Sequence, residues 1–525
     1  DHVAHPCQVL ANFRSEPTNQ TKKRSVVRAF HPSQDRIGCT AHTSTAPVNP
    51  TLFLTCFFFY ITGMIAFGCW VSRKKQSGED FLLGGRSLPL FLTLGTTLAT
   101  MVGTGSSMGA VGKAYEGGWM GSLYGIGGAI GILVTAWLFA PMRRHRFMTM
   151  AEELSSYVGA NRSVANLVAI FTYLSSVGWL GAHVLGGAMY LEFVTGIHPH
   201  WAKLWIAGGF GIYAIIGGYR AVVWTDTVQA VVLFFGFLLT AIFALQAAGG
   251  WSGLGEINTR IVSDGGVALL PSISLIVVIA VGVMGTPSFR QRIYSGNSVR
   301  DIRKAFVGSG ILYFGFAALP AIIGMAAFNA YPDLANRDLA FPTMATQMLP
   351  VAVGMLVLLS ATMSSASSDA IAGVTTVIRD LYHAVFQKMP PAERVVFYSR
   401  LALAVTTALA LGMALISDNI IGYISDIIAL FITGLCVCGI LGRTWERYNA
   451  PGAIASLVGA SATAIYFKLD TDLGEIWGNP VIPSLVISAG ADIIVSLITP
   501  HDKCTHEEAL ERLRKEREQM EQTQP

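Results

Sequence analysis

Residues 360–370 read SATMSSASSDA, and the stretch that follows them, IAGVTTVIRDLY, is mostly apolar. If this segment crosses a membrane as a helix, it carries six hydroxyl groups and the carboxylate of Asp369 into a medium with little water. A carboxylate at the centre of a membrane helix costs about 2.5–3.5 kcal/mol, so such residues usually face a bundle interior or an aqueous cavity. The polar side chains of this segment are therefore candidates for a functional site.

Four small residues of this segment share one face of the predicted helix. They follow the i, i+3, i+4, i+7 spacing, and Asp369 lies directly beside them. The four are Ala361, Ser364, Ser365 and Ser368. Close helix packing is one explanation, because small residues let neighbouring helices approach. Packing would be served equally well by Ala or Gly, however, and hydroxyl and carbonyl oxygens suit a hard cation. The density of hydroxyl groups favours the cation site.

The whole chain has the composition of a polytopic membrane protein. Of its 525 residues 52% are hydrophobic and 13% are charged, against about 25% charged residues in a typical soluble domain. The lipid bilayer is thus its expected surroundings, and a net charge of +4 gives no reason to expect a nucleic-acid partner. Apolar runs of about 20 residues, the length that spans a membrane as a helix, predict an all-α protein with thirteen transmembrane helices. They fall near residues 51–71, 89–111, 118–140, 164–192, 203–218, 221–247, 268–286, 305–328, 344–378, 398–416, 419–441, 450–467 and 481–499.

Lys and Arg are unevenly distributed among the predicted loops. Twenty lie in one set of alternate loops, Arg290 and Arg292 among them, and five lie in the opposite set. The richer side is expected to be cytoplasmic. Thirteen spans then place the N-terminus outside and the C-terminus inside a plasma (inner) membrane. The sequence contains no pattern that predicts an oligomeric state.

The two ends of the chain differ from the rest in composition. Residues 1–48 are polar, and we expect this leader not to be part of the working protein. Residues 49–500 form the predicted membrane domain. Residues 501–525 include EEALERLRKEREQMEQ, which predicts a charged, solvated cytoplasmic helix.

Two of the predicted spans contain residues that interrupt helices. Gly and Pro weaken a helix interior, and they cluster in TMVGTGSSMGAVG at 100–112 and in VGVMGTPSF at 281–289. The two spans are five apart, which predicts a ten-helix core of two inverted sets of five helices, with a central site at the breaks. The alternative is that Gly-rich helices merely pack tightly, in a chain with 55 glycines.

Four carboxylates fall inside predicted spans: Asp226, Asp369, Asp426 and Asp492. Asp226 and Asp369 stand beside other polar signals, which favours a place at the site. Asp426 and Asp492 stand alone, so a structural hydrogen bond is at least as good an explanation for each.

Three stretches resemble the sodium/solute symporters, the family of the proline, pantothenate, sugar, sialic acid and choline transporters. They are FLLGGRSLP at 81–89, GGYRAVVWTDTVQA at 217–230 and ATMSSASSDAIAGVTTVIRDLY at 361–382. The resemblance extends from about residue 51 to residue 500. It implies an inverted five-plus-five-helix repeat of the leucine-transporter type, with an extra helix before the core and further helices after it.

The resemblance also implies where Na+ binds. The common site of the family would use backbone carbonyls of the first and the eighth core helix and two hydroxyls of the opening stretch. The corresponding residues are Ala99, Val102, Ala361, Ser364 and Ser365. Some members, among them the sialic acid transporters, hold a second sodium, which here would involve Asp226, Ser367 and Ser368. The helical wheel places Ser367 away from the main stripe.

The solute is less well indicated by the resemblance. The aromatic cage of the choline transporters is incomplete, because two of its positions are Met101 and Ser288, and the tryptophan of the proline carriers is Gly105 here. A neutral or zwitterionic solute, such as an amino acid, fits best, although Asp369 could instead bind an amine or make a structural hydrogen bond. The expected substrate-binding residues are Thr104, Ser106, Trp179, Ser288, Phe289 and Asp369, and His183 is expected to be a packed histidine rather than a proton relay.

The leading hypothesis is sodium-coupled secondary active symport of a small organic solute by alternating access. A membrane sensor that binds solute is an alternative function, and an organic amine or a carboxylate is an alternative solute. An enzyme is not expected, because no nucleophile–base pair, metal cluster or phosphate loop appears in a suitable context. We therefore predict no catalytic residues.

Overall fold

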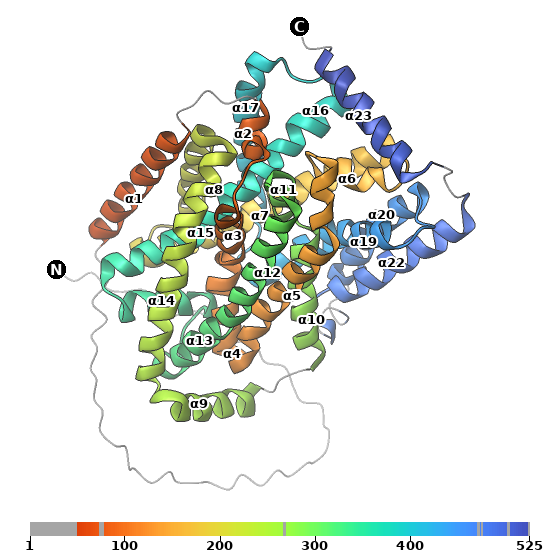
Figure 1. Ribbon diagram of the computed structural model, residues 1–525. Coiled ribbons are helices and arrows are strands. Elements are labelled where there is room, and N and C mark those ends of the chain that lie inside the picture. Colours follow the sequence, from red (N-terminus) through yellow and green to blue (C-terminus); the bar gives the residue numbers. More distant parts are fainter. Residues whose placement is uncertain are drawn as a thin grey trace, which may run out of the picture. The chain divides into compact units, whose positions relative to one another are not determined.

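The computed structural model describes residues 50–72, 78–265, 269–469, 473, 476–500 and 504–522. The predicted leader, 1–48, lies outside these residues. Within them the regular structure is helical, apart from one backbone bridge between Leu88 and Gly296 (Figure 1). The prediction of an all-α protein is confirmed.

The helices of the first half include two that are interrupted where the sequence predicts breaks. α3 ends at Met101 and a π-helical turn follows at Gly105–Gly109, whereas α10 and α11 meet at an angle of 43°. The helices are α1 (Pro50–Val71), α2 (Gly78–Leu83), α3 (Leu90–Met101), α4 (Ala110–Gly117), α5 (Ser122–Leu138), α6 (Met150–Ser156), α7 (Arg162–Thr195), α8 (Pro199–Ala247), α9 (Gly250–Gly265), α10 (Leu269–Gly285), α11 (Pro287–Ser295), α12 (Val299–Phe316) and α13 (Ala318–Ala330).

The second half continues with the helix that holds the opening stretch of hydroxyls, α15. Two further π-helical turns lie in this half, at Val377–Leu381 and Ile428–Ile432. The helices are α14 (Ala340–Met348), α15 (Val351–Thr376), α16 (Tyr382–Phe386), α17 (Val395–Leu415), α18 (Ile420–Ile427), α19 (Thr433–Thr444), α20 (Ala450–Leu469), α22 (Val481–Ile498) and α23 (His506–Gln522).

The described residues contain ten helices that are long and apolar enough to cross a membrane, or eleven if α10 and α11 form one bent span. This number is smaller than the thirteen predicted spans, because some predicted spans are interrupted helices and two others lie in a single helix. α3 has only 12 residues, since the helix ends just before Gly103. The predicted spans 203–218 and 221–247 both lie in α8, which is kinked at Gly218 (φ 62°).

α15 is the most enclosed of the long helices. It packs against α7 and α8, while α3 packs against α8 and α12. α5 packs against α10 and α12, and α20 and α22 pack against each other (Figure 1). Because α15 is surrounded by protein, its hydroxyl groups do not meet lipid, and the bundle interior can hold a polar site.

Arg290 and Arg292, predicted to lie in a cytoplasmic loop, are instead completely buried in α11. Arg290 pairs with Glu153 at 2.8 Å, and Arg292 lies 3.6 Å from Asp226. Buried charges require such partners. In the sequence the two arginines follow the end of an apolar run, which is why they were assigned to a loop. In the structure α11 follows α10 as the second part of a bent span and contains both arginines.

The C-terminal helix α23 is charged, as predicted, but it is not solvated on every side. Ala509 and Leu513 are buried, and Arg517 Nη2 lies 2.8 Å from Glu152 Oε2 on α6. Burial alone would raise the pKa of Glu152, but the positive charge of Arg517, with Arg379 and Arg86 nearby and a hydrogen bond from the backbone of Met148, lowers the pKa below its usual value. The ion pair therefore holds α23 against the membrane domain.

Candidate functional site

The break after α3 brings backbone close to α15. Val102 leaves the helical conformation (φ −96°, ψ 73°), and Gly103 follows it. A β-carbon on Gly103 would come within 2.6 Å of Ser365 Oγ. Only glycine therefore permits this approach, which explains why the sequence has a helix-weakening residue here.

The two serines at the centre of α15 contact the backbone at the end of α3. Ser364 Oγ donates to the carbonyl oxygen of Ala99 at 3.2 Å, and Ser365 Oγ donates to the same oxygen at 3.1 Å. Ser365 Oγ also lies 3.4 Å from the carbonyl oxygen of Thr100. Val102 and Ala361, also predicted as ligands, are completely buried at the end of α3 and in α15. The serine hydroxyls and the carbonyl oxygens of Ala99 and Thr100 thus lie together, and such oxygens are the ligands that a hard cation prefers.

Thr100 was not predicted as part of this site. Its carbonyl oxygen is exposed to Ser365 because α3 ends one residue later. The last carbonyls of a helix have no partner within it, so the glycine break itself was the signal that could have identified Thr100.

A second cluster surrounds Asp226, which is completely buried in α8. Three hydroxyl groups donate to its carboxylate: Thr96 at 2.8 Å, Ser367 at 3.2 Å and Ser368 at 2.6 Å. Ser367 thus reaches Asp226 although it lies away from the main stripe of α15. The structure brings together all three residues predicted for a second sodium.

A guanidinium group lies within the same cluster. Arg292 Nη2 donates to Ser368 Oγ at 2.7 Å, to Thr96 Oγ1 at 2.9 Å and to the carbonyl oxygen of Thr96 at 3.2 Å, and it also contacts Thr100 Oγ1. Neither Arg292 nor Thr96 was predicted here. The charge of Asp226 could have indicated a basic partner, because a buried carboxylate is costly unless a cation lies beside it.

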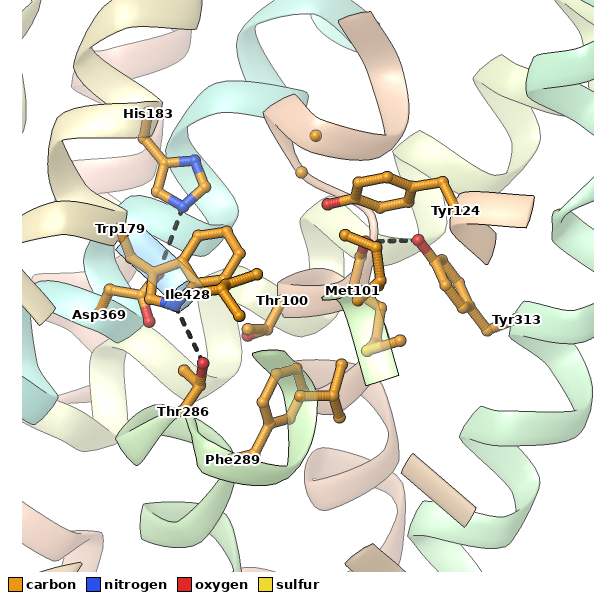
Figure 2. Close-up of a pocket in the computed structure, with 14 residues that line it drawn as sticks. Thr100, Met101, Tyr124, Trp179, His183, Thr286, Phe289, Tyr313, Asp369 and Ile428 are labelled. Atoms are coloured by element: carbon orange, nitrogen blue, oxygen red, sulfur yellow. Dashed lines mark hydrogen bonds and ion pairs between the residues drawn. The ribbon is translucent and has the colours of Figure 1, made fainter. Parts of the chain in front are cut away.

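A small cavity lies beside the break in α3. Its volume is about 40 Å³, room for roughly three water molecules. Figure 2 shows His183, Trp179, Asp369 and Thr286 on one side and Met101, Tyr124 and Tyr313 on the other. The lining residues are Thr100, Met101, Gly103, Gly105, Tyr124, Trp179, His183, Ile279, Val283, Thr286, Phe289, Tyr313, Asp369 and Ile428.

The polar side of the cavity is organised by two hydrogen-bonded pairs. His183 Nε2 lies 3.3 Å from Asp369 Oδ2, and Trp179 Nε1 donates to Thr286 Oγ1 at 2.9 Å (Figure 2). His183 Nδ1 lies 3.1 Å from Thr104 Oγ1. His183 thus links Thr104 to Asp369 across the polar side of the cavity.

The six predicted substrate-binding residues divide into two groups. Trp179, Phe289 and Asp369 line the cavity. Thr104 contacts His183 behind the lining, and Ser106 donates to backbone carbonyls of its own segment. Ser288 is buried, and its hydroxyl has no hydrogen-bond partner within the described part of the chain. A role of these residues in binding solute stays a prediction.

The other two intramembrane carboxylates have partners away from the cavity. Asp426 pairs with Lys468, and Asp492 accepts a hydrogen bond from Ser496 at 3.2 Å. Both arrangements agree with a structural role.

Residues 81–459 match the sodium:solute symporter family, a span that contains both clusters and the cavity. The chain belongs to this family. It is 28% identical to the sodium/proline symporter of Salmonella typhimurium over 85% of this chain and 93% of that one. It is 25% identical to the sodium/pantothenate symporter of Haemophilus influenzae over 83% and 94% of the two chains.

Solved structures agree with the fold of this symporter. A Na+-coupled sialic acid symporter in a substrate-bound outward-open state matches with a TM-score of 0.74 and 19% identity, over 86% of this chain and 99% of that one. MhsT in complex with L-phenylalanine matches with a TM-score of 0.53 and 14% identity, over 77% and 97% of the two chains. The predicted family and the leucine-transporter type of fold are confirmed.

The family defines the general activity. The protein is a multi-pass membrane symporter that couples a small organic solute to sodium. Sodium is a transported coupling ion here rather than a resident cofactor. The relatives are transporters, not enzymes.

Proposed function

We propose that this symporter imports a neutral or zwitterionic solute of amino-acid size together with sodium, and that it has no enzymatic activity. Sodium binds between α3 and α15, on the carbonyls of Ala99, Val102 and Ala361 and the hydroxyls of Ser364 and Ser365. The observation that carries the proposal is the contact of both serine hydroxyls with the Ala99 carbonyl. An ion at this point replaces those hydrogen bonds by stronger ion–oxygen contacts and ties the two helices together.

The sodium site and the cavity share one piece of backbone. The carbonyl oxygen of Thr100 faces Ser365, while Thr100 and Gly103 also line the cavity. Ordering of this segment by sodium therefore prepares the solute site. By linkage, solute must strengthen sodium binding by the same factor as sodium strengthens solute binding.

The cavity lies among buried helices, and we propose that these helices separate to let solute enter. Alternating access then requires the cavity to open to one side at a time. The proposed direction is import, because the inward movement of one positive charge through 100 mV supplies about 2.3 kcal/mol. The proposed orientation has the N-terminus outside and the C-terminus in the cytoplasm, on the side with more Lys and Arg.

Uptake into proteoliposomes tests this function. With labelled L-proline and L-alanine, we expect an inward sodium gradient to raise uptake of at least one of them about 10-fold over an equal potassium gradient, since the downhill movement of sodium provides the driving force. Equal uptake under the two gradients would contradict symport. Sodium-dependent binding without uptake would instead indicate a solute sensor.

A further inference from the structure

We propose that the solute carries a protonated amine and that Asp369 binds it. This inference rests on the proposed function and specifies its substrate. Asp369 is 3% exposed and lines the cavity. His183 occupies Oδ2, whereas Oδ1 is buried and has no hydrogen-bond partner among the described residues.

The charge of the cavity points to a cationic group. Asp369 is the one acidic side chain among the described residues that line the cavity, and none of these is Lys or Arg. A buried carboxylate with a free oxygen is costly unless a cation pairs with it. A solute that is itself an anion would meet this charge without a compensating side chain.

The other lining residues distinguish an organic amine from a metal ion. Sodium needs several oxygen ligands, but the wall around Asp369 is mainly aromatic and aliphatic. It includes Trp179, Phe289, Ile428 and Val283. An ammonium group on a small apolar body satisfies both features, because its charge meets the carboxylate and its carbon atoms meet the aromatic rings.

The same position explains how the amine would be linked to transport. Asp369 lies one helical turn after Ser365, which contacts the Ala99 carbonyl from the same helix. A solute held by Asp369 therefore contacts α15 one helical turn from the proposed sodium ion. Asp369 is in this sense a specificity-determining residue.

Binding to the purified full-length protein tests the proposal. Thermal unfolding is measured in sodium with propylamine, L-proline, L-alanine, N-acetyl-L-alanine, propionate and D-glucose. We expect stabilisation by compounds with a free amine, and loss of at least 10-fold in their affinity in Asp369→Asn, a change that keeps the shape and removes the charge. Asp426→Asn is the matched control, because it also removes an intramembrane carboxylate but leaves the cavity intact.

Several outcomes would overturn the amine site. They are stabilisation by glucose, propionate or N-acetyl-L-alanine equal to that by the amines, unchanged amine affinity in Asp369→Asn, or no effect of any amine on a protein that sodium stabilises. If Asp369→Asn does not fold, the comparison of L-alanine with N-acetyl-L-alanine on the wild-type protein decides alone. Absence of any sodium effect would count against the proposed function instead.

A separate observation concerns the number of sodium ions. We infer that the guanidinium of Arg292 takes the place of the second sodium predicted at Asp226, Ser367 and Ser368. Its Nη2 group already donates to Ser368 Oγ, and it lies 3.6 Å from Asp226 Oδ2. The residues of this cluster are completely or almost completely buried.

The charge and the hydrogen-bonding groups of Asp226 are already satisfied by protein side chains, so a second sodium ion is not needed in this cluster. Arg292 is permanently protonated, so it neutralises Asp226 without sodium. The carboxylate accepts hydrogen bonds from Thr96, Ser367 and Ser368 on both of its oxygens. A sodium ion here would either face the guanidinium or displace it and leave a buried arginine without its carboxylate.

Counting bound ions tests this inference. We expect ²²Na+ to bind the purified wild-type protein at one site per chain with a Hill coefficient near one. Asp226→Asn with Arg292→Gln, which removes both charges together, should retain sodium affinity within 3-fold. Two ions per wild-type chain would overturn the inference, as would loss of sodium binding in the double variant with its folding intact. The wild-type count is sufficient if the double variant does not fold.

Discussion

Replacement of Ser364 and Ser365 together by alanine is expected to abolish sodium-dependent uptake. Each hydroxyl that contacts a buried charged group contributes about 1.5–3 kcal/mol, so loss of both should weaken sodium binding by about 100-fold or more. Both hydroxyls meet the Ala99 carbonyl at 3.1–3.2 Å, and both side chains are buried.

The measurement is solute uptake into proteoliposomes over a series of sodium concentrations, together with the shift in thermal unfolding that sodium causes. The shift separates loss of ion binding from loss of folding, because a ligand stabilises only the state that binds it. Ser360→Ala is the matched control. It removes a buried hydroxyl from the same helix, but its partner is Tyr60 on α1 at 2.9 Å. An unchanged apparent sodium affinity in the double variant would rule out this site.

Glu153→Gln is expected to give the largest loss of stability. Glu153 and Arg290 are completely buried and 2.8 Å apart, and the guanidinium lies over the ring of Phe139. Tyr294 and Tyr157 also donate to the carboxylate, at 2.6 Å and 3.1 Å. Removal of one partner of a buried ion pair leaves an uncompensated charge and costs about 3–5 kcal/mol.

Thermal and denaturant unfolding of the purified variants measures this effect. Glu116→Gln is the control, because Glu116 pairs with Arg337 on the surface and is about half exposed; such pairs contribute about 0–1 kcal/mol. Addition of Arg290→Met to Glu153→Gln should recover part of the loss, since no unpaired charge then remains. Equal stability of Glu153→Gln and Glu116→Gln would contradict a structural role for the buried pair.

Features that depend on neighbouring residues in the chain could be predicted well. A membrane span must satisfy its backbone groups internally, so runs of apolar residues indicated the helices. The breaks could be predicted from Gly103 and Pro287, because each of these residues weakens the interior of the helix that contains it. The stripe of Ser364 and Ser365 followed from helical periodicity, and its sodium-binding role came from the resemblance to the family.

Features that depend on which helix faces which could not be predicted. Arg292 is 66 positions from Asp226, and helical periodicity specifies the face of a residue but not the helix opposite it. The two buried arginines therefore looked like loop residues. The contact of His183 with Asp369, which leaves one carboxylate oxygen free, likewise depends on the packing of α7 against α15.

The sequence by itself thus determined the membrane class, the interrupted helices and the oxygen-rich face of α15, because each depends on residues within one or two turns of a helix. The tertiary structure decided which charges are paired and which remain available in the cavity. The physical reason is that the energy of a buried charge depends on groups brought to it from distant parts of the chain, and only packing specifies these.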